Sequence, residues 1–402
     1  NSWEAVGLKK ARPRIYLDYN ATSPCRAEVV AAVSKTAAAV FGNASSPTVE
    51  GRAARRILED ARDAVAGALG ASSASEIVFT GGGTEADNLA ILGAVRRAPR
   101  VRTPHVVTTA IEHYAVLNTC RLLADTGVKV TFVGCDSRGY VPPQQVISAL
   151  RANTVLVSVM HSNNEVGTLQ DIQPIAAEAR RRGILFHGDA VQSLGRVPLN
   201  LARLNADLVA FSGHKVGGPK GVGILYVRKG VDLAPVFGGG QQERARRPGT
   251  ENVPAIAGLA LAVKMAAKAQ PRESIRLAGL RDMLWAGIQR EVPHVALNGD
   301  PAHSLPNTLN VSFWGISGED VMMALDLAGV AVSTGSACAV GAHKSSHVIE
   351  AMHPGTSRGC APVRMSLGFR TTDDEIAIAI ERIPPVIQRL RGSGKSCCCN
   401  AG

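Results

Sequence analysis

The chain has 402 residues and a net charge of +11; 46% of its residues are hydrophobic and 4% aromatic. This length favours one large and one smaller domain over a single simple core. No apolar run reaches the roughly 18 residues that a membrane span needs, and no basic cluster is interleaved with aromatic side chains, so we expect neither a membrane protein nor a nucleic-acid-binding one. The basic surface could be merely solvated or could attract an acidic protein.

Eight cysteines are spread along the chain. In a protein this long they do not form a disulfide framework, so we expect a reducing compartment, the cytoplasm or an organellar matrix. We assign no role to Cys397–Cys399, which lie in a tail rich in Gly, Ser and Lys. Residues 1–14 and 393–402 are expected to be flexible tails, and whether the first is a trimmed targeting segment stays open.

Apolar runs with the length of buried strands alternate with helical patterns up to about residue 255. The expected strands are Glu76–Thr80, His105–Thr109, Lys129–Val133, Val155–Met160, Leu185–Gly188, Leu208–Ser212 and Gly223–Val227. The expected helices are Thr48–Ala68, Thr84–Val95, Val116–Ala124, Pro143–Arg151 and Pro174–Arg182. This alternation predicts an α/β fold with a mostly parallel, seven-stranded sheet between helices.

The pattern changes near residues 260–272. The elements expected around and beyond this point are helices over Ile256–Lys268 and Ser274–Glu291, strands over Thr308–Phe313 and Val330–Ser333, and helices after Gly318 and Asp373. We therefore expect a large domain over residues 15–265 and a smaller α+β domain over residues 266–392. The first residues of the large domain are free to pack against the small one.

The segment Gly81–Asn88 follows a predicted strand and begins a helix. Glycines let the backbone approach an anion closely, and a helix N-terminus favours negative charge, so Gly83 and Thr84 are candidates for holding a phosphate group. Taken alone, the segment could equally be an ordinary strand-to-helix turn with Thr84 as the N-cap.

Asp189 and Lys215 form the most informative pair. Lys215 closes a Ser-Gly-His-Lys run, 26 residues after Asp189. A lysine among glycines suits a Schiff base with an aldehyde cofactor, and a carboxylate after an apolar run suits the protonated ring nitrogen of pyridoxal 5'-phosphate (PLP). Gln192 can reach the phenolic oxygen of that ring, and Ser212 and His214 can donate to its phosphate; capping and turn chemistry are the alternatives.

His113 and Asn164 each follow a predicted strand. The carboxyl ends of parallel strands form the ligand-binding edge of such sheets. His113 could stack on the cofactor ring and move protons, and Asn164 could hydrogen-bond to substrate or cofactor. A lone histidine is more often structural, so this interpretation depends on the neighbouring motifs.

Two candidates lie in the second domain. Cys338 stands in a stretch of small residues, where a nucleophilic thiol would have exposure and freedom of movement; a buried residue in a turn is the alternative. Arg364 lies in an otherwise apolar strand. Its guanidinium fork fits a substrate α-carboxylate, with a structural salt bridge as the alternative.

Taken together, the motifs identify a resemblance that runs from about Ile15 to about Leu390. The chain resembles the cysteine desulfurases of the class V aminotransferase group, within the fold-type I PLP enzymes, and its Cys338 segment is similar to that of the longer-loop, NifS/IscS-like subgroup. The resemblance is carried by Tyr16–Thr22, Gly42–Ser46, Gly82–Glu85, Asn163–Glu165, Asp189–Gln192, Ser212–Lys215, Arg247–Asn252, Ser336–Cys338 and Arg364. Ala44 departs from a frequent proline.

The resemblance implies a homodimer that converts L-cysteine to L-alanine and passes the sulfur to an acceptor, such as an iron–sulfur scaffold protein. It implies catalytic roles for Lys215, His113 and Cys338, with the persulfide on Cys338. The implied PLP-binding residues are Gly83, Thr84, His113, Asn164, Asp189, Gln192, Ser212, His214, Lys215 and, from the neighbouring subunit, Thr250. The implied substrate-binding residues are Asn43, Asn164 and Arg364, and no metal is expected.

Two other functions remain open from the sequence. A selenocysteine lyase shares the fold and the PLP residues. A non-catalytic PLP-binding scaffold is the other, although the intact set of Lys215, Asp189, His113, Cys338 and Arg364 speaks against it.

Overall fold

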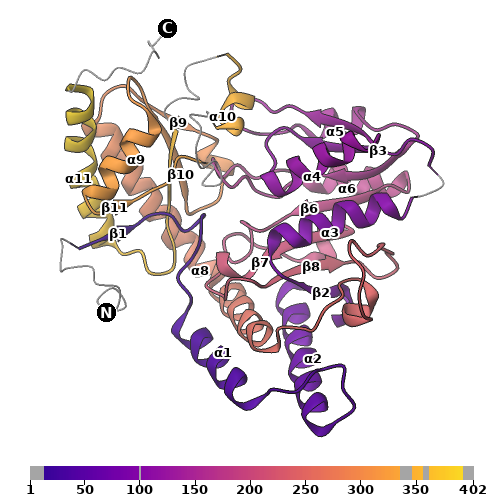
Figure 1. Ribbon diagram of the computed structural model, residues 1–402. Coiled ribbons are helices and arrows are strands. Elements are labelled where there is room, and N and C mark those ends of the chain that lie inside the picture. Colours follow the sequence, from indigo (N-terminus) through magenta and orange to yellow (C-terminus); the bar gives the residue numbers. More distant parts are fainter. Residues whose placement is uncertain (1–12, 99–100, 336–345, 356–361, 393–402) are drawn as a thin grey trace.

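Seven strands form one sheet in the larger of two lobes (Figure 1). The structure is a computed structural model that describes residues 13–98, 101–335, 346–355 and 362–392. In spatial order the strands are β2 (Ile77–Thr80), β8 (Gly223–Val227), β7 (Leu208–Ser212), β6 (Leu185–Asp189), β5 (Thr154–Ser158), β3 (His105–Thr109) and β4 (Lys129–Val133). Only the pairings of β8 in this sheet are antiparallel, so the predicted mostly parallel α/β sheet is confirmed.

The two faces of the sheet are covered by different helices because side chains along a strand alternate in direction. In β7, Val209 and Phe211 enter one core, whereas Leu208 and Ala210 enter the other. The first core is closed by α2 (Val49–Leu69), α5 (Pro143–Ser148), α6 (Ile172–Arg181) and the start of α8 (Val253–Glu291). The second is closed by α3 (Gly83–Arg96) and α4 (Tyr114–Asp125).

The smaller lobe has its own antiparallel sheet and its own core. Its strands are β12 (Pro362–Ser366), β10 (Thr308–Phe313) and β9 (Val295–Asn298), packed by the end of α8, α9 (Gly318–Leu327) and α11 (Asp373–Gly392). The start of the chain joins this core, because β1 (Ile15–Tyr16) pairs with β11 (Val330–Ala331). Arg14, expected in a tail, forms an ion pair with Asp326.

One helix of the second part of the chain packs on the larger lobe. Helix α10 (His347–Met352) buries Val348, Ile349 and Met352 in the core beneath the seven-stranded sheet. The segment between β11 and α10 therefore connects the two lobes.

Helix α8 corrects one prediction. The expected helices Ile256–Lys268 and Ser274–Glu291 are one continuous helix of 39 residues that contains Pro271. A proline inside a helix costs about 3 kcal/mol. Here the first half of the helix is buried in the core of the larger lobe and the second half in that of the smaller one, so packing outweighs that cost.

By length and composition, α8 is also the one helix among the described residues that could cross a membrane. Within the fold, 56% of its most apolar window is buried. Its apolar character is accounted for by the two cores that it joins.

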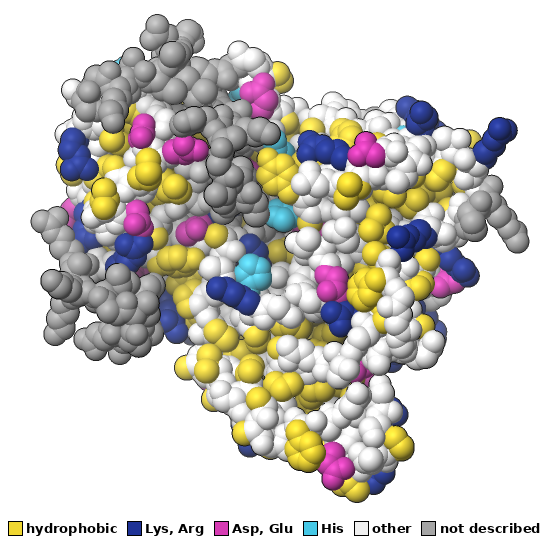
Figure 2. Space-filling view, viewed as in Figure 1, with side chains coloured by type: hydrophobic (Ala, Val, Ile, Leu, Met, Phe, Trp, Pro, Cys, Tyr) yellow, Lys and Arg dark blue, Asp and Glu magenta, His cyan; other side chains and the backbone are white. Residues whose placement is uncertain are grey.

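Helices α1 (Ala27–Ala39) and α2 project from the larger lobe (Figure 1). Hydrophobic side chains are visible on this projection in Figure 2. Phe41 is 85% exposed, Val49 68% and Val30 48%. In the single chain, this apolar surface faces solvent.

The turn between β2 and α3 depends on a glycine in the neighbouring strand. A Cβ atom at Gly223 would lie 2.6 Å from the carbonyl carbon of Gly82. We predict that Gly223→Ala lowers the free energy of unfolding by about 1–3 kcal/mol, because backbone rather than a movable side chain must shift. Urea unfolding would measure this loss.

Gly67→Ala is the matched control for that variant. Gly67 lies within α2, and a Cβ there would meet no atom within 4 Å. It should leave the protein unchanged or stabilise it by about 0.5–1 kcal/mol, since alanine is the better helix former. Equal stability of Gly223→Ala and the wild type would contradict the close approach.

Candidate active site

A cavity of about 240 Å³ opens at the carboxyl edge of the large sheet. It is lined by residues that follow β2, β3, β5 and β7 and by the end of β6. Among the residues predicted from the sequence, it gathers Gly83, Thr84, His113, Asn164, Asp189, Gln192, Ser212, His214 and Lys215. Segments far apart in the chain thus meet at one site.

Lys215 lies in the short 3₁₀ turn Gly213–Lys215 after β7. Its Nζ donates to the backbone carbonyls of Asn20, at 2.5 Å, and Ala21, at 2.8 Å. Burial, together with the nearby guanidinium groups of Arg364 and Arg196, lowers the pKa of Lys215 to about 7. A large share of this amine is therefore neutral, and hence nucleophilic, near pH 7.

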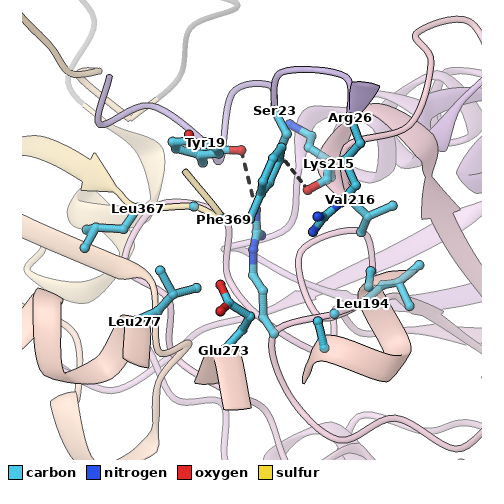
Figure 3. Close-up of a pocket in the computed structure, with 15 residues that line it drawn as sticks. Tyr19, Ser23, Arg26, Leu194, Lys215, Val216, Glu273, Leu277, Leu367 and Phe369 are labelled. Carbon is cyan, nitrogen blue, oxygen red and sulfur yellow. Dashed lines mark hydrogen bonds between the residues drawn. The ribbon is translucent and has the colours of Figure 1, made fainter. Parts of the chain in front are cut away.

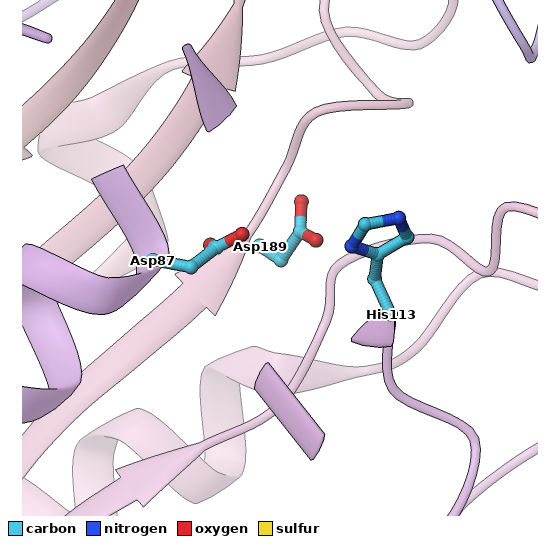
Figure 4. A group of neighbouring side chains, drawn as sticks. All are labelled: Asp87, His113 and Asp189. Carbon is cyan, nitrogen blue, oxygen red and sulfur yellow. The ribbon is translucent and has the colours of Figure 1, made fainter. Parts of the chain in front are cut away.

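Asp189 ends β6 and is buried beside His113 and Asp87 (Figure 4). One carboxylate oxygen or ring nitrogen from each of the three lies within 4.8 Å of the others. Burial raises the pKa of Asp189 to about 6, although its Oδ1 accepts a hydrogen bond from the Val191 amide at 2.9 Å. A cation placed against this carboxylate would restore its charge.

A second set of acids lies behind Asp189, and the sequence analysis did not single it out. Burial raises the pKa of Asp87 well above its usual range and that of Glu112 to about 8. The Nε2 atom of His187 lies 3.4 Å from Asp87 Oδ1. The sequence does contain a signal for Asp87: it lies one turn after the candidate residue Thr84 on α3, and residues at this spacing share a helix face.

His113 caps the N-terminus of α4. Its Nδ1 accepts a hydrogen bond from the Ala115 amide at 3.1 Å. Burial and then the charge of Lys215 lower the pKa of His113 to about 4. The ring is therefore neutral near pH 7, with its proton on Nε2, from which it can donate.

The glycine turn forms the other end of the cavity. A Cβ atom at Gly83 would lie 2.9 Å from Val191 Cγ2 and 3.3 Å from Ser212 Cβ. A wider cavity of about 750 Å³ adjoins at Gly83, Thr84, Ser212 and His214. The ring of His214 is held by a hydrogen bond of 3.0 Å between Nδ1 and Thr22 Oγ1, and burial lowers its pKa to about 4.

Gln192 is held by two neighbours at the edge of this site. Its Nε2 donates to the carbonyl of Asn20 at 3.0 Å, and its Oε1 accepts from Arg196. Arg196 is buried, and burial lowers its pKa to about 9. The amide of Gln192 is therefore fixed in place at the cavity wall.

Arg364 is buried in β12 and joins three segments. Its Nη2 pairs with Asp18 Oδ1 at 2.9 Å, and its Nη1 donates to the carbonyls of Asn164 at 3.0 Å and Gly335 at 3.2 Å. Arg364 thus forms the structural salt bridge that was the alternative to substrate binding. However, Arg364 Nε and Asn164 Oδ1 are both buried and have no hydrogen-bond partner among the residues that the structure describes, so polar groups remain for a ligand.

Three predicted residues are not gathered at the cavity. Asn43 and Thr250 are exposed and line neither of these cavities. Cys338 lies outside the described residues. The proposed contribution of Thr250 from a second subunit concerns a contact that a single chain does not contain.

A small cavity of about 50 Å³ lies where the lobes meet, beside Lys215 (Figure 3). The guanidinium carbon of Arg26 lies 4.0 Å from the centroid of the Phe369 ring, and Glu273 of α8 lines the same space. The Ser23 hydroxyl donates to the Lys215 carbonyl at 2.9 Å. The backbone of the lysine is thus held in place at this smaller cavity.

Comparison with known proteins finds this organisation elsewhere. Residues 15–378 match the family model for aminotransferase class-V. Cysteine desulfurase IscS of Dictyoglomus turgidum is 41% identical over 377 residues, 94% of this chain and 95% of that protein. Among solved structures, a NifS-like protein is 35% identical, with a TM-score of 0.87 over 94% of this chain and all (100%) of that one. SspA in complex with cysteine is 34% identical, with a TM-score of 0.76 over 88% and 98%.

The lowered pKa of Lys215 can be tested without any cofactor. In competitive labelling with acetic anhydride, followed by peptide mass analysis, the labelling rate of Lys215 should rise through pH 7 and level off above, since the amine is then neutral. A lysine with the ordinary pKa of about 10.4 would keep gaining reactivity beyond pH 9. The same continued rise at Lys215 would contradict the effect of burial.

Proposed function

The chain belongs to the aminotransferase class-V family, and from that premise we propose that it is a PLP-dependent cysteine desulfurase. It converts L-cysteine to L-alanine and takes the sulfur onto Cys338 as a persulfide, for iron–sulfur cluster assembly or another sulfur-containing cofactor. The observation that carries the proposal is one cavity lined both by a lysine amine of lowered pKa, Lys215, and by a buried carboxylate, Asp189.

The residues at the cavity fit PLP. Lys215 would bind its aldehyde, Asp189 its ring nitrogen and Gln192 its phenolic oxygen, with His113 over the ring. Gly83, Thr84, Ser212 and His214 would hold the phosphate at the start of α3, where backbone amides favour an anion, and Thr250 of a second subunit would complete this set. When bound, PLP supplies an electron sink for the bonds around the substrate α-carbon.

The buried position of Asp189 matters for this fit. A carboxylate deprived of water gains most from a cationic partner, and a protonated ring nitrogen would be that partner. Burial raises the pKa of the acids behind it, Asp87 and Glu112, and so favours their neutral forms, which makes them weaker competitors for the same cation.

Arg364 and Asn164 would hold the substrate carboxylate, with Asn43 as a further candidate. Asp18 fixes the Nη2 end of the guanidinium, while Nε has no partner in the described part of the chain. A carboxylate can therefore approach along the edge that includes Nε.

Lys215 and His113 would move protons at the α- and β-carbons, since near pH 7 His113 is neutral and a large share of Lys215 is neutral too. In the net reaction, the Cys338 thiolate attacks the substrate sulfur and the Cβ–S bond breaks. Its electron pair stays with carbon, which takes up a proton, so L-cysteine plus thiol gives L-alanine plus persulfide.

The proposed assembly is a homodimer that passes sulfur to an acceptor protein in the cytoplasm or an organellar matrix. The exposed apolar residues of the α1–α2 projection, Val30, Phe41 and Val49, support burial against another chain. The positive charge of +11 favours an acidic acceptor.

The selenocysteine lyase alternative is not favoured, because the relatives described above include a cysteine desulfurase and a NifS-like protein, each matched over nearly its whole length. A purely structural PLP site would not need an amine of lowered pKa beside a buried acid.

The function is tested by incubating the holoenzyme with L-cysteine, assaying alanine and mapping the persulfide by mass. The wild type should form alanine and carry the extra sulfur on Cys338. Cys338→Ser should keep the visible absorbance of bound PLP but form no protein persulfide. Full activity with a stable persulfide on another residue would move the nucleophile away from Cys338.

Asp189→Asn tests the role of the buried carboxylate. The amide keeps the size of the side chain but removes its charge, so kcat should fall by about 100-fold or more, the scale of other disrupted catalytic electrostatics. The measurement is alanine formation per PLP bound. Near-normal turnover at full PLP occupancy would contradict the role of Asp189.

A further inference from the structure

We propose that Arg196 is a positioning residue: it fixes the side-chain amide of Gln192 so that Nε2, and not Oε1, is presented to the phenolic oxygen of PLP. The proposal rests on the proposed function, in which PLP occupies the cavity beside Lys215. It concerns residues that the structure describes, in the turn after β6 and in the segment Tyr19–Asn20.

A side-chain amide has two ends of nearly the same shape and of opposite chemistry. The NH₂ group of Gln192 would donate to a negatively charged phenolic oxygen, whereas its carbonyl oxygen would repel that atom. The orientation of the amide therefore decides whether Gln192 stabilises the bound ring or opposes it.

Arg196 fixes the oxygen end of the amide. Its Nη1 donates to Gln192 Oε1 and, at 2.9 Å, to the backbone carbonyl of Gln192. A guanidinium has donors only, so the amide atom that faces it must be the acceptor. Gln192 lines the cavity of about 240 Å³, whereas Arg196 lines the small cavity where the lobes meet. The amide oxygen thus faces a residue outside the proposed PLP site.

Asn20 fixes the nitrogen end. Gln192 Nε2 donates to the Asn20 carbonyl at 3.0 Å, and this carbonyl also accepts from Lys215 Nζ at 2.5 Å. Asn20 is itself held by the smaller lobe, since its amide donates to Ser366 Oγ and its Nδ2 to Thr308 Oγ1, both at 2.9 Å. The nitrogen of Gln192 and the amine of Lys215 therefore share one fixed acceptor.

These contacts leave one hydrogen of Gln192 for a ligand. Nε2 carries two hydrogens, and the contacts among the described residues use one, toward Asn20. The reversed amide would place acceptor against acceptor at Asn20 and donor against donor at Arg196. Two independent contacts therefore select the same orientation.

Arg196 is an unusual residue for a purely structural position. It is 7% exposed, and its acceptors among the described residues are neutral oxygens: Gln192 Oε1 and the carbonyls of Gln192 and Tyr19, the latter at 3.4 Å. Burial and then the charge of Arg364 lower its pKa to about 9, so the guanidinium is charged near pH 7. A buried cation without a carboxylate partner is costly.

The charge of Arg196 strengthens the donor at the other end of the amide. A cation at Oε1 draws electron density toward the oxygen, which polarises the Nε2–H bonds. The same cation therefore both orients Gln192 and makes it a better donor to a phenolic oxygen.

The backbone of Arg196 is anchored separately. Ser274 Oγ of α8 donates to the Arg196 carbonyl at 2.5 Å and accepts from Gln270 Nε2 at 2.7 Å. The Arg196 amide donates to the Ser193 carbonyl at 3.1 Å. These contacts exist without any ligand, so the donor of Gln192 is in place before PLP arrives.

Loss of Arg196 would have two effects that must be separated. Its charge also contributes to the lowered pKa of Lys215 and of His214, so removing it acts directly on the site. Loss of the amide orientation, in contrast, acts only where Gln192 is present. A double-mutant cycle between Arg196 and Gln192 measures this second effect.

The test compares the wild type, Arg196→Met, Gln192→Leu and the double variant between pH 6 and pH 10. The readouts are the pH midpoint at which the visible absorbance of bound PLP changes, and the Kd for PLP when the apo-protein is reloaded. Arg281→Met is the control for loss of a buried arginine. Arg281 is 8% exposed, donates to the Leu305 carbonyl at 3.1 Å and lines neither cavity next to Lys215 or the glycine turn.

A donor at the phenolic oxygen stabilises its negative charge and weakens its hold on a neighbouring proton. Arg196→Met and Gln192→Leu should therefore each raise the midpoint by about one pH unit and weaken PLP binding by about 10-fold, the scale of one lost hydrogen bond to a charged group. In the Gln192→Leu background, Arg196→Met should shift the midpoint by less than about half as much. Arg281→Met should match the wild type.

A shift from Arg196→Met that is equally large with and without Gln192 would overturn the proposal, because Arg196 would then act by its charge alone. Arg196→Lys keeps the charge and a donor for Oε1, so it should stay close to the wild type. If Arg196→Met does not fold, Arg196→Lys takes its place in the cycle, and any shift that persists undiminished without Gln192 overturns the proposal. A wild type that binds PLP but forms no alanine from L-cysteine would instead refute the proposed function.

Discussion

The site depends on the alignment of parallel strand ends in the large sheet. Residues from 83 to 215 meet because β2, β3, β5, β6 and β7 point the same way and end at one edge. Loss of water at this edge then acts on every ionisable group in the same sense, favouring the neutral form. It lowers the pKa of the bases Lys215 and His113 and raises that of the acid Asp189. The pKa values of acid and bases therefore approach one another, which makes proton exchange between them easier.

Local pattern was sufficient for most of the larger lobe. Its strands are short apolar runs, and their observed bounds agree with the predicted ones within two residues. Nine of the predicted cofactor-site residues line one cavity, because each follows or ends a strand that could be recognised. The continuous α8 was not predictable locally, since a proline favours a helix end and, in this helix, that preference is outweighed by two separate cores that bury its halves.

The contacts that the sequence did not reveal are those between distant residues. Asp18 and Arg364 are 346 positions apart, and Glu165 and Ser346 are 181 apart. Asp87, Asp189 and Glu112 come from a helix, a strand and a loop, and their effect on one another exists only once they are buried together. Residue type alone does not give such pairs; they follow from the three-dimensional placement of the strands and of the two lobes.

Helix α8 also sets how the lobes can shift. Because α8 runs from one lobe into the other without a break, relative motion of the lobes must bend this helix, and Pro271 is the natural point because a hydrogen bond is missing there. From Pro271 to Glu291 the axis extends about 30 Å, at about 1.5 Å per residue. A bend of about 5° would then carry the far end through about 3 Å. This geometry acts as a lever: a slight angular change at Pro271 becomes a displacement as large as a hydrogen-bond length at the periphery of the smaller lobe.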